Sequence, residues 1–331
     1  MQSDRKLRML ANSLKLRQIL CILFGFSVGC VFNKTIRQFT GWRLRDAAIP
    51  PTGIPMSLSP NTASINLASK SVTSIRILCM ILTMPNNHAL QARAVKHTWA
   101  SRCDDYFFVS SLNDSHLPAY AAVSTENRNQ LWDKTKFGVI YAATQYGRPF
   151  DYLFKADDDT YVIVENLRKM LEEHPKNQSV IMGRRFKPFV QQGYPSGGAG
   201  YVISRMGIDK IAHGMLTKKK CGIFAHTWTE DVRMGQCAQA VGVPMVDSLD
   251  AEGLERFHPV SAFDIFNWDE NATSNWLTYY NYHKLLVGQR CCSNYSITFH
   301  YIKPSEMFTY DFLLYHIHTV FNKAEHDLSA N

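Results

Sequence analysis

The chain has 331 residues, of which 46% are hydrophobic and 12% are aromatic, so it is long enough to bury one large core or two modest ones. Its formal net charge of +8 would suit a nucleic-acid-binding protein. Residues 1–45 hold nine Lys and Arg side chains and one acidic side chain, so this segment accounts for the whole charge. The rest of the chain is formally neutral, and its composition excludes a polyanion-binding body.

The first element is the uncharged stretch QILCILFGFSVGCVFN, residues 18–33, which lies between Arg17 and Lys34. As a helix its sixteen residues would cover roughly 24 Å, and the flanking basic side chains can extend the span to the bilayer surfaces. We predict a transmembrane signal anchor, with a cleaved signal peptide and a buried core helix as alternatives. The basic residues 1–17 then form a cytoplasmic tail, and the body lies in the lumen.

Residues 34–73 contain four prolines among Ser, Thr and Asn and lack apolar periodicity, which predicts a flexible stem. The body, residues 74–331, holds six cysteines, an even number that suits an oxidising compartment. Short loops favour the pairs Cys79–Cys103 and Cys221–Cys237. Cys291 and Cys292 then form a vicinal pair, or they pair elsewhere.

The body begins with alternating strand and helix patterns. The apolar runs 75–84, 106–112 and 151–156 predict buried strands, and the segments 89–99, 127–146 and 165–174 predict helices. This alternation predicts an α/β fold with a mostly parallel central sheet flanked by helices. Ligands of such sheets bind at the carboxyl ends of the strands.

Three aspartates follow the third strand in DYLFKADDDTYV. Because side chains alternate along an extended chain, Asp157 and Asp159 point one way and Asp158 points the other. Two converging carboxylates repel unless a cation lies between them, so the pattern predicts a Mg²⁺ or Mn²⁺ site that also binds a diphosphate. The alternatives are a helix cap with solvated neighbours and a haloacid-dehalogenase motif, which Tyr161 in the fifth position disfavours.

Two later stretches carry further candidates. Glu230 and Asp231 open a helical pattern in TEDVRMGQCAQAVGV, where Asp231 is either a partner of the helix dipole or a general base. In QQGYPSGGAGYVISR, Gly197 and Gly198 would let a ligand approach the backbone, although an ordinary turn explains them equally well. The basic cluster in MGRRFKP, which includes Arg185, faces either phosphates or solvent.

The stretches FKADDDTYVIVENLR, GRRFKP, QGYPSGGAGYVIS, EDVRMGQC, FHP and CCSNYSITFHY, together with LWDKT and HTWASRC, resemble the core 1 β1,3-galactosyltransferases. These belong to the larger β1,3-glycosyltransferase group that includes Fringe-like enzymes. The resemblance covers Ile75 to His316, nearly the whole body. The D-x-D pattern is common to many transferases, whereas the combined set of motifs is specific.

The resemblance implies a type II Golgi membrane protein with a single catalytic domain of the GT-A type. It implies transfer of galactose from UDP-galactose, with Mn²⁺, to GalNAc on Ser or Thr of glycoproteins, with inversion. Asp157, Asp159 and His300 would hold the metal, with His258 as the second choice for the histidine. Asp231 would be the base.

On the donor side, the resemblance implies that Asp158 contacts the sugar or ribose and that Gly197 and Gly198 let the sugar lie against the backbone. Arg93 is placed near the uridine, and Arg185 is a further donor-binding candidate. Homodimers occur among the relatives. Two alternatives remain: an inactive lumenal paralogue that acts as a chaperone or binding protein, and a β1,3-transferase with another donor sugar.

Overall fold

The structure is a computed structural model that describes residues 75–217, 221, 229–268 and 276–318. All of these belong to the second of two compact units, Lys70–Asn331. The expected tail, signal anchor and stem (1–17, 18–33 and 34–73) lie outside the described residues. Within the part that the structure describes, each helix is too short or too polar to span a bilayer.

The described residues form a main sheet of seven strands. In spatial order these are β10 (Met245–Val246), β6 (Ile181–Gly183), β9 (Tyr201–Ser204), β4 (Tyr152–Asp157), β1 (Ile77–Leu82), β2 (Asp105–Ser110) and β3 (Ala119–Ala121). Four neighbouring pairs run parallel, and β9 runs antiparallel to both β4 and β6. The expected α/β fold with a mostly parallel sheet is confirmed.

Strand β1 shows why the first apolar run folds as a central strand. Ile77, Cys79 and Ile81 belong to one hydrophobic core, and the alternate residues 78, 80 and 82 belong to another. Successive side chains of a strand point to opposite faces, so a strand covered on both faces needs apolar residues at every position. All six residues of β1 are buried.

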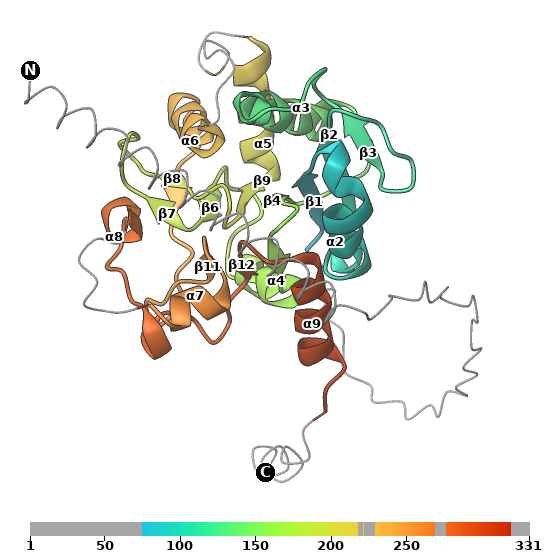
Figure 1. Ribbon diagram of the computed structural model, residues 1–331. Coiled ribbons are helices and arrows are strands. Elements are labelled where there is room, and N and C mark those ends of the chain that lie inside the picture. The colour runs from blue at the N-terminus through green and yellow to red at the C-terminus, as the bar shows by residue number, and fades with distance from the viewer. Residues whose placement is uncertain (1–74, 218–220, 222–228, 269–275, 319–331) are drawn as a thin grey trace, which may run out of the picture. The chain divides into compact units, whose positions relative to one another are not determined.

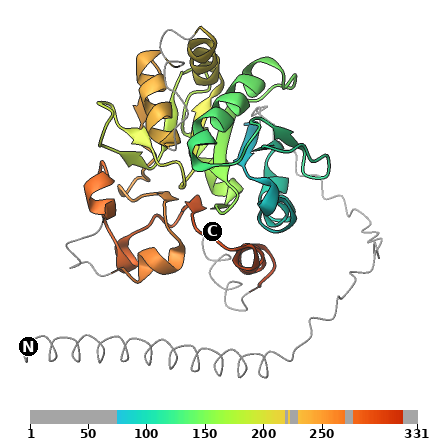
Figure 2. The ribbon, with the colours of Figure 1, turned by 45° about the horizontal axis from the view of Figure 1, so that its top comes forward.

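Helices cover both faces of the sheet (Figure 1). Helices α3 (Leu131–Thr144), α5 (Arg205–Leu216) and α6 (Glu230–Ala240) supply one core, and α2 (Arg93–His97), α4 (Val164–Glu172) and α9 (Pro304–Tyr315) supply the other. Figure 2 shows the green α3, the yellow α5 and the orange α6 together on one side of the strands, with the red α9 on the other. The expected helices at 89–99, 127–146 and 165–174 correspond to α2 with its preceding turn, α3 and α4.

Shorter elements complete the fold around the carboxyl edge of the sheet. A small sheet joins β11 (Phe257–His258), β12 (Thr298–Phe299) and β5 (Tyr161–Val162), and a two-stranded ribbon joins β7 (Arg185–Phe186) and β8 (Tyr194–Pro195). Helices α7 (Ala262–Phe266) and α8 (Trp276–Tyr280) each have five residues. Short helical turns are formed by η1 (Pro85–Asn87), η2 (His88–Ala92), η3 (Ala100–Arg102), η4 (Arg128–Gln130) and η5 (Gly288–Arg290).

Three disulfides connect the described cysteines. Cys79–Cys103 joins β1 to the end of η3, and Cys221–Cys237 joins the segment after α5 to α6. Cys291 and Cys292 form the third bond with each other. Both expected pairs are confirmed, and the open choice for the last two cysteines is settled as a vicinal pair.

Replacing both Cys79 and Cys103 by alanine is expected to lower the free energy of unfolding by about 3 kcal/mol, because the bond closes a loop with a sequence separation of 24 residues. Urea denaturation of the oxidised protein measures this loss. The matched control replaces Cys291 and Cys292, whose bond closes almost no loop. Equal losses from the two double variants would contradict the loop-closure explanation.

Candidate active site

The end of strand β4 carries the three aspartates. Asp157 is the last residue of β4, a turn closed by the Thr160 amide on the Asp157 carbonyl follows, and β5 begins at Tyr161. Asp157, Asp159 and His300 converge there, with one ligand atom of each within 4.8 Å of the others. The turn therefore aims two carboxylates of one strand end at the same point.

His300 reaches this point through the small sheet. Strand β12 pairs antiparallel with β5, with Phe299 opposite Tyr161, and the Ile302 amide donates to the Asp159 carbonyl at 2.9 Å. This pairing leaves His300 Nε2 at 3.1 Å from Asp159 Oδ1. The contact joins residues far apart in the chain, so only strand pairing brings them together.

The charges of this group favour a bound cation. Burial would raise the pKa of Asp159, but the hydrogen bond and charge of His300 outweigh burial and hold that pKa below its usual value. Burial alone would lower the pKa of His300, but the hydrogen bond to Asp159 and the charges of Asp159 and Asp157 outweigh burial and raise that pKa above its usual value. Two carboxylates and an imidazole are ligands that divalent cations accept. A cation bound here would replace the imidazole proton as the partner of the carboxylates.

His258, the second choice for the metal-binding histidine, lies in different surroundings. Its ring is fully buried, stacks on Phe299 with centroids 4.7 Å apart, and shares a 3.0 Å hydrogen bond with Ser296 Oγ. Burial, aided by the charge of Arg184, lowers the pKa of His258 well below its usual value. His258 is not a member of the three-residue group that could hold a metal.

Asp158 points away from the other two aspartates. Its Oδ2 accepts hydrogen bonds from Thr83 Oγ1 at 2.6 Å and from Asn87 Nδ2 at 3.0 Å. Burial raises the pKa of Asp158 to about 6, although these two hydrogen bonds act against the increase. Asp158 thus ties the loop after β1 to the loop after β4 and does not line the cavity described below.

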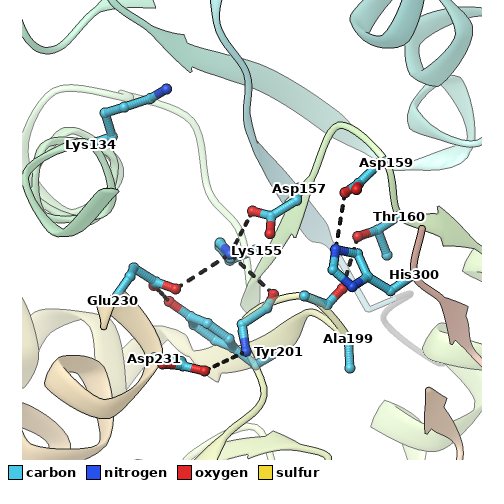
Figure 3. A network of polar contacts seen from close by, with 12 residues as sticks. Lys134, Lys155, Asp157, Asp159, Thr160, Ala199, Tyr201, Glu230, Asp231 and His300 are labelled. Atoms are coloured by element: carbon cyan, nitrogen blue, oxygen red, sulfur yellow. Dashed lines mark hydrogen bonds and ion pairs between the residues drawn. The ribbon is translucent and has the colours of Figure 1, made fainter. Parts of the chain in front are cut away.

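A buried lysine connects the metal-binding group to helix α6 (Figure 3). Lys155 Nζ lies 2.8 Å from Asp157 Oδ1, 3.5 Å from Glu230 Oε2 and 3.1 Å from the Gly197 carbonyl. Glu230 also accepts a hydrogen bond from the Tyr201 hydroxyl at 2.5 Å. The sequence reasoning missed Lys155, although a lysine inside the apolar run DYLFKA was a signal, because a buried ammonium needs carboxylate partners.

Asp231 lies in the first turn of α6, next to Glu230. Its Oδ2 accepts a hydrogen bond from the Gly197 amide at 3.3 Å. Burial, and to a lesser degree the neighbouring Glu230 carboxylate, raises the pKa of Asp231 to about 6. A carboxylate with this pKa is ionised at neutral pH and is still basic enough to accept a proton.

Gly197 and Gly198 leave space for neighbouring side chains of the site. A Cβ built on Gly198 would lie 2.3 Å from Cε1 of His300, and one built on Gly197 would lie 3.0 Å from Glu230 Oε2 and 3.3 Å from the Asp231 Cβ. No real Cβ atom tolerates the first of these distances. Glycine is therefore required at 198 for the close approach of His300, irrespective of any ligand, whereas a side chain at 197 would need Glu230 and Asp231 to shift by a few tenths of an ångström.

These groups share one cavity of about 620 Å³. Asp157, Asp231 and His300 line it together with Lys155 and the backbone of Gly197 and Gly198. Aromatic side chains form another part of its wall: Phe186, Phe189, Tyr194, Trp276, Tyr280 and Tyr301. The sequence reasoning missed this aromatic wall, whose members come from separate short elements.

The structure does not bring Arg93 and Arg185 to this cavity. Arg93 lines a second cavity of about 440 Å³, together with His88 and Lys96 among others. The Arg185 guanidinium donates to the Gln192 carbonyl, pairs with Asp247 at 2.9 Å and lies over the Tyr282 ring.

Replacing Gly198 by alanine is expected to displace His300 and to weaken Mn²⁺ binding by about ten-fold or more, because a new Cβ would overlap the imidazole. Isothermal titration of the full chain with Mn²⁺ measures the affinity. Gly242→Ala is a control for backbone strain without a steric clash: its φ is +73°, and its Cβ would meet no atom within 4 Å, so Mn²⁺ affinity should stay unchanged. Unchanged Mn²⁺ affinity in the Gly198 variant would exclude His300 from the metal-binding group.

Comparison with known proteins identifies the family of this chain. Residues 72–300 match the family model described as Fringe-like. The chain is 39% identical over 259 residues to glycoprotein-N-acetylgalactosamine 3-beta-galactosyltransferase 1 of Xenopus laevis, covering 78% of this chain and 70% of the relative. It is 24% identical over 186 residues to a beta-1,3-glucosyltransferase of Mus musculus, covering 55% of this chain and 37% of that protein.

Among solved structures, a Drosophila beta-1,4-galactosyltransferase 7 in complex with manganese, UDP-Gal and xylobiose matches 54% of this chain and 67% of its own, with 12% identity and a TM-score of 0.33. This score is too low to support a comparison of folds, so the fold is assigned from the sheet itself. The family assignment rests instead on the extent of the family match and on the sequence identity to the Xenopus protein. The chain belongs to the Fringe-like family of glycosyltransferases.

Proposed function

We propose that this protein is an inverting β1,3-galactosyltransferase that moves galactose from UDP-galactose to O3 of GalNAc α-linked to Ser or Thr of glycoproteins. The name of the Xenopus relative supports this donor sugar and this acceptor. One observation carries the proposal: Asp157 and His300, two members of the group that could hold a metal, line the same cavity as Asp231, a carboxylate with a raised pKa. This pair suits an inverting transferase, in which a base activates the acceptor hydroxyl and a cation stabilises the charge on the leaving diphosphate.

Asp231 acts as the general base in this proposal. The acceptor O3 attacks C1 of galactose as the bond between C1 and the diphosphate oxygen breaks, and the electron pair of that bond leaves with UDP. The O3 proton passes to Asp231, whose carboxylate is oriented by the Gly197 amide. One displacement at C1 inverts the anomeric centre, so no covalent intermediate with the protein is required.

Asp157, Asp159 and His300 would hold Mn²⁺ on the donor side. The cation, when bound, neutralises the negative charge that grows on the departing diphosphate. Lys155 orients Asp157 through the 2.8 Å ion pair and offsets the charge of Glu230 beside the base. Asp158 fixes the loop after β1 relative to the metal-binding turn.

We also propose a Golgi location for the enzyme, with residues 18–33 as a signal anchor and the catalytic body in the lumen. The basic flank of residues 1–17 supports this orientation. The three disulfides of the described body support an oxidising compartment.

The first test incubates the detergent-solubilised full chain with UDP-galactose, Mn²⁺ and a GalNAc-bearing peptide. We expect transfer that EDTA abolishes, because the carboxylates alone cannot bind the diphosphate. UDP-glucose and UDP-GlcNAc are the donor controls, and faster transfer from either would change the donor assignment. A folded protein that transfers nothing and binds a related transferase instead would support the chaperone alternative.

The second test changes the base. Asp231→Asn is expected to lower kcat by about 1,000-fold, because it removes the group that accepts the proton of the acceptor hydroxyl. The affinity for Mn²⁺ and UDP should stay unchanged. In the parent protein, kcat/KM should be constant above the Asp231 pKa of about 6 and fall ten-fold per pH unit below it, because only the ionised carboxylate accepts the proton. A flat profile between pH 4.5 and 7.5 would assign the base elsewhere.

A further inference from the structure

Part of the cavity wall is a connected aromatic shelf, formed by Phe186, Phe189, Tyr194, Trp276 and Tyr280. Neighbouring rings lie about 6 Å apart: Tyr194 to Phe186 at 5.8 Å, Phe186 to Tyr280 at 5.7 Å and Tyr280 to Phe189 at 6.2 Å. Trp276 lies 6.2 Å from Phe186 and 5.9 Å from Tyr280. All five residues line the cavity that contains Asp231.

The shelf becomes more exposed away from its buried end. Tyr194 and Phe186 are 1% and 4% exposed, whereas Trp276 and Phe189 are 45% and 64% exposed. A pyranose ring is about the size of one phenyl ring, so a single acceptor sugar covers one member of the shelf or two. The exposed outer rings are therefore left for a ligand longer than a monosaccharide.

The backbone of Phe189 adds an independent observation. Its φ is +72°, a left-handed conformation that is costly for a bulky side chain. Strain of this kind persists where the surrounding structure holds it, and such positions concentrate at ligand-binding sites. Here the strain presents an exposed phenyl ring at the outer end of the shelf.

We propose that Phe189 and Trp276 bind the polypeptide that carries the acceptor sugar, in an extended conformation and with prolines beside the modified residue. This inference rests on the proposed function. Prolyl rings and extended backbones dock on grooves lined by aromatic rings, with little loss of conformational entropy. The shelf itself consists of aromatic side chains without ionised groups, so it would select apolar flanking residues rather than charged ones.

The test compares two acceptors with the full-length enzyme. One is methyl α-GalNAc, and the other is GalNAc-O-Thr within a peptide whose neighbouring residues are prolines. Phe189→Ala is expected to lower the ratio of kcat/KM for the glycopeptide over the monosaccharide about ten-fold, and Phe189→Tyr should restore the ratio. Tyr295→Ala removes an equally exposed aromatic ring that does not line the cavity, and it should leave the ratio unchanged.

Phe189→Gly guards against a folding artefact, because glycine adopts the left-handed conformation without strain. This variant should lose the same selectivity and melt at an equal or higher temperature than the parent. An unchanged ratio in both Phe189→Ala and Phe189→Gly, or an equal loss of kcat/KM with both acceptors, would overturn the inference while the proposed function stands. If the parent enzyme transferred galactose to neither acceptor, the proposed function would fail, and the inference would fail with it.

Discussion

The site depends on one buried ammonium group. Lys155 lies within the central sheet and contacts the carboxylates of Asp157 and Glu230. Without it, several carboxylates would face one cavity with few compensating charges, and burying an unpaired charge costs several kcal/mol. The lysine also donates to the Gly197 carbonyl, and the amide of the same glycine donates to Asp231. One side chain thus fixes the positions of a proposed metal ligand and of the proposed base together.

The sheet topology explains how these groups reach one edge. Strand β4 ends at Asp157, whereas the neighbouring β9 runs in the opposite direction and begins at Tyr201, opposite Lys155. The glycine loop that precedes β9 therefore lies at the same edge as the aspartates. Gly200, with a φ of +76°, completes the turn into β9 beside the Lys155 carbonyl. An all-parallel sheet would have carried this loop to the other end of the strands.

The sequence predicted what depends on local pattern. Continuous apolar runs identified β1, β2 and β4, the alternation of side chains separated Asp158 from its neighbours, and short loops identified two disulfides. The family resemblance, not the residue pattern, placed His300 ahead of His258. The physical reason lies in the pairing of β5 with β12, each two residues long, and such strands leave no periodicity in a sequence. The aromatic shelf was missed for a related reason, since its residues come from β7, β8, α8 and a loop and meet only in three dimensions.

The pairing of β5 with β12 also has a consequence for biosynthesis. Asp159 and His300 are separated by about 140 residues, and the strand that carries His300 to the aspartates is near the carboxyl end of the described body. During synthesis the aspartates leave the ribosome long before their third partner exists. The proposed cation site is therefore completed only after His300 has been made, so a chain that stops before β12 lacks it. Binding of a divalent cation to these three residues would therefore report that β5 and β12 have paired.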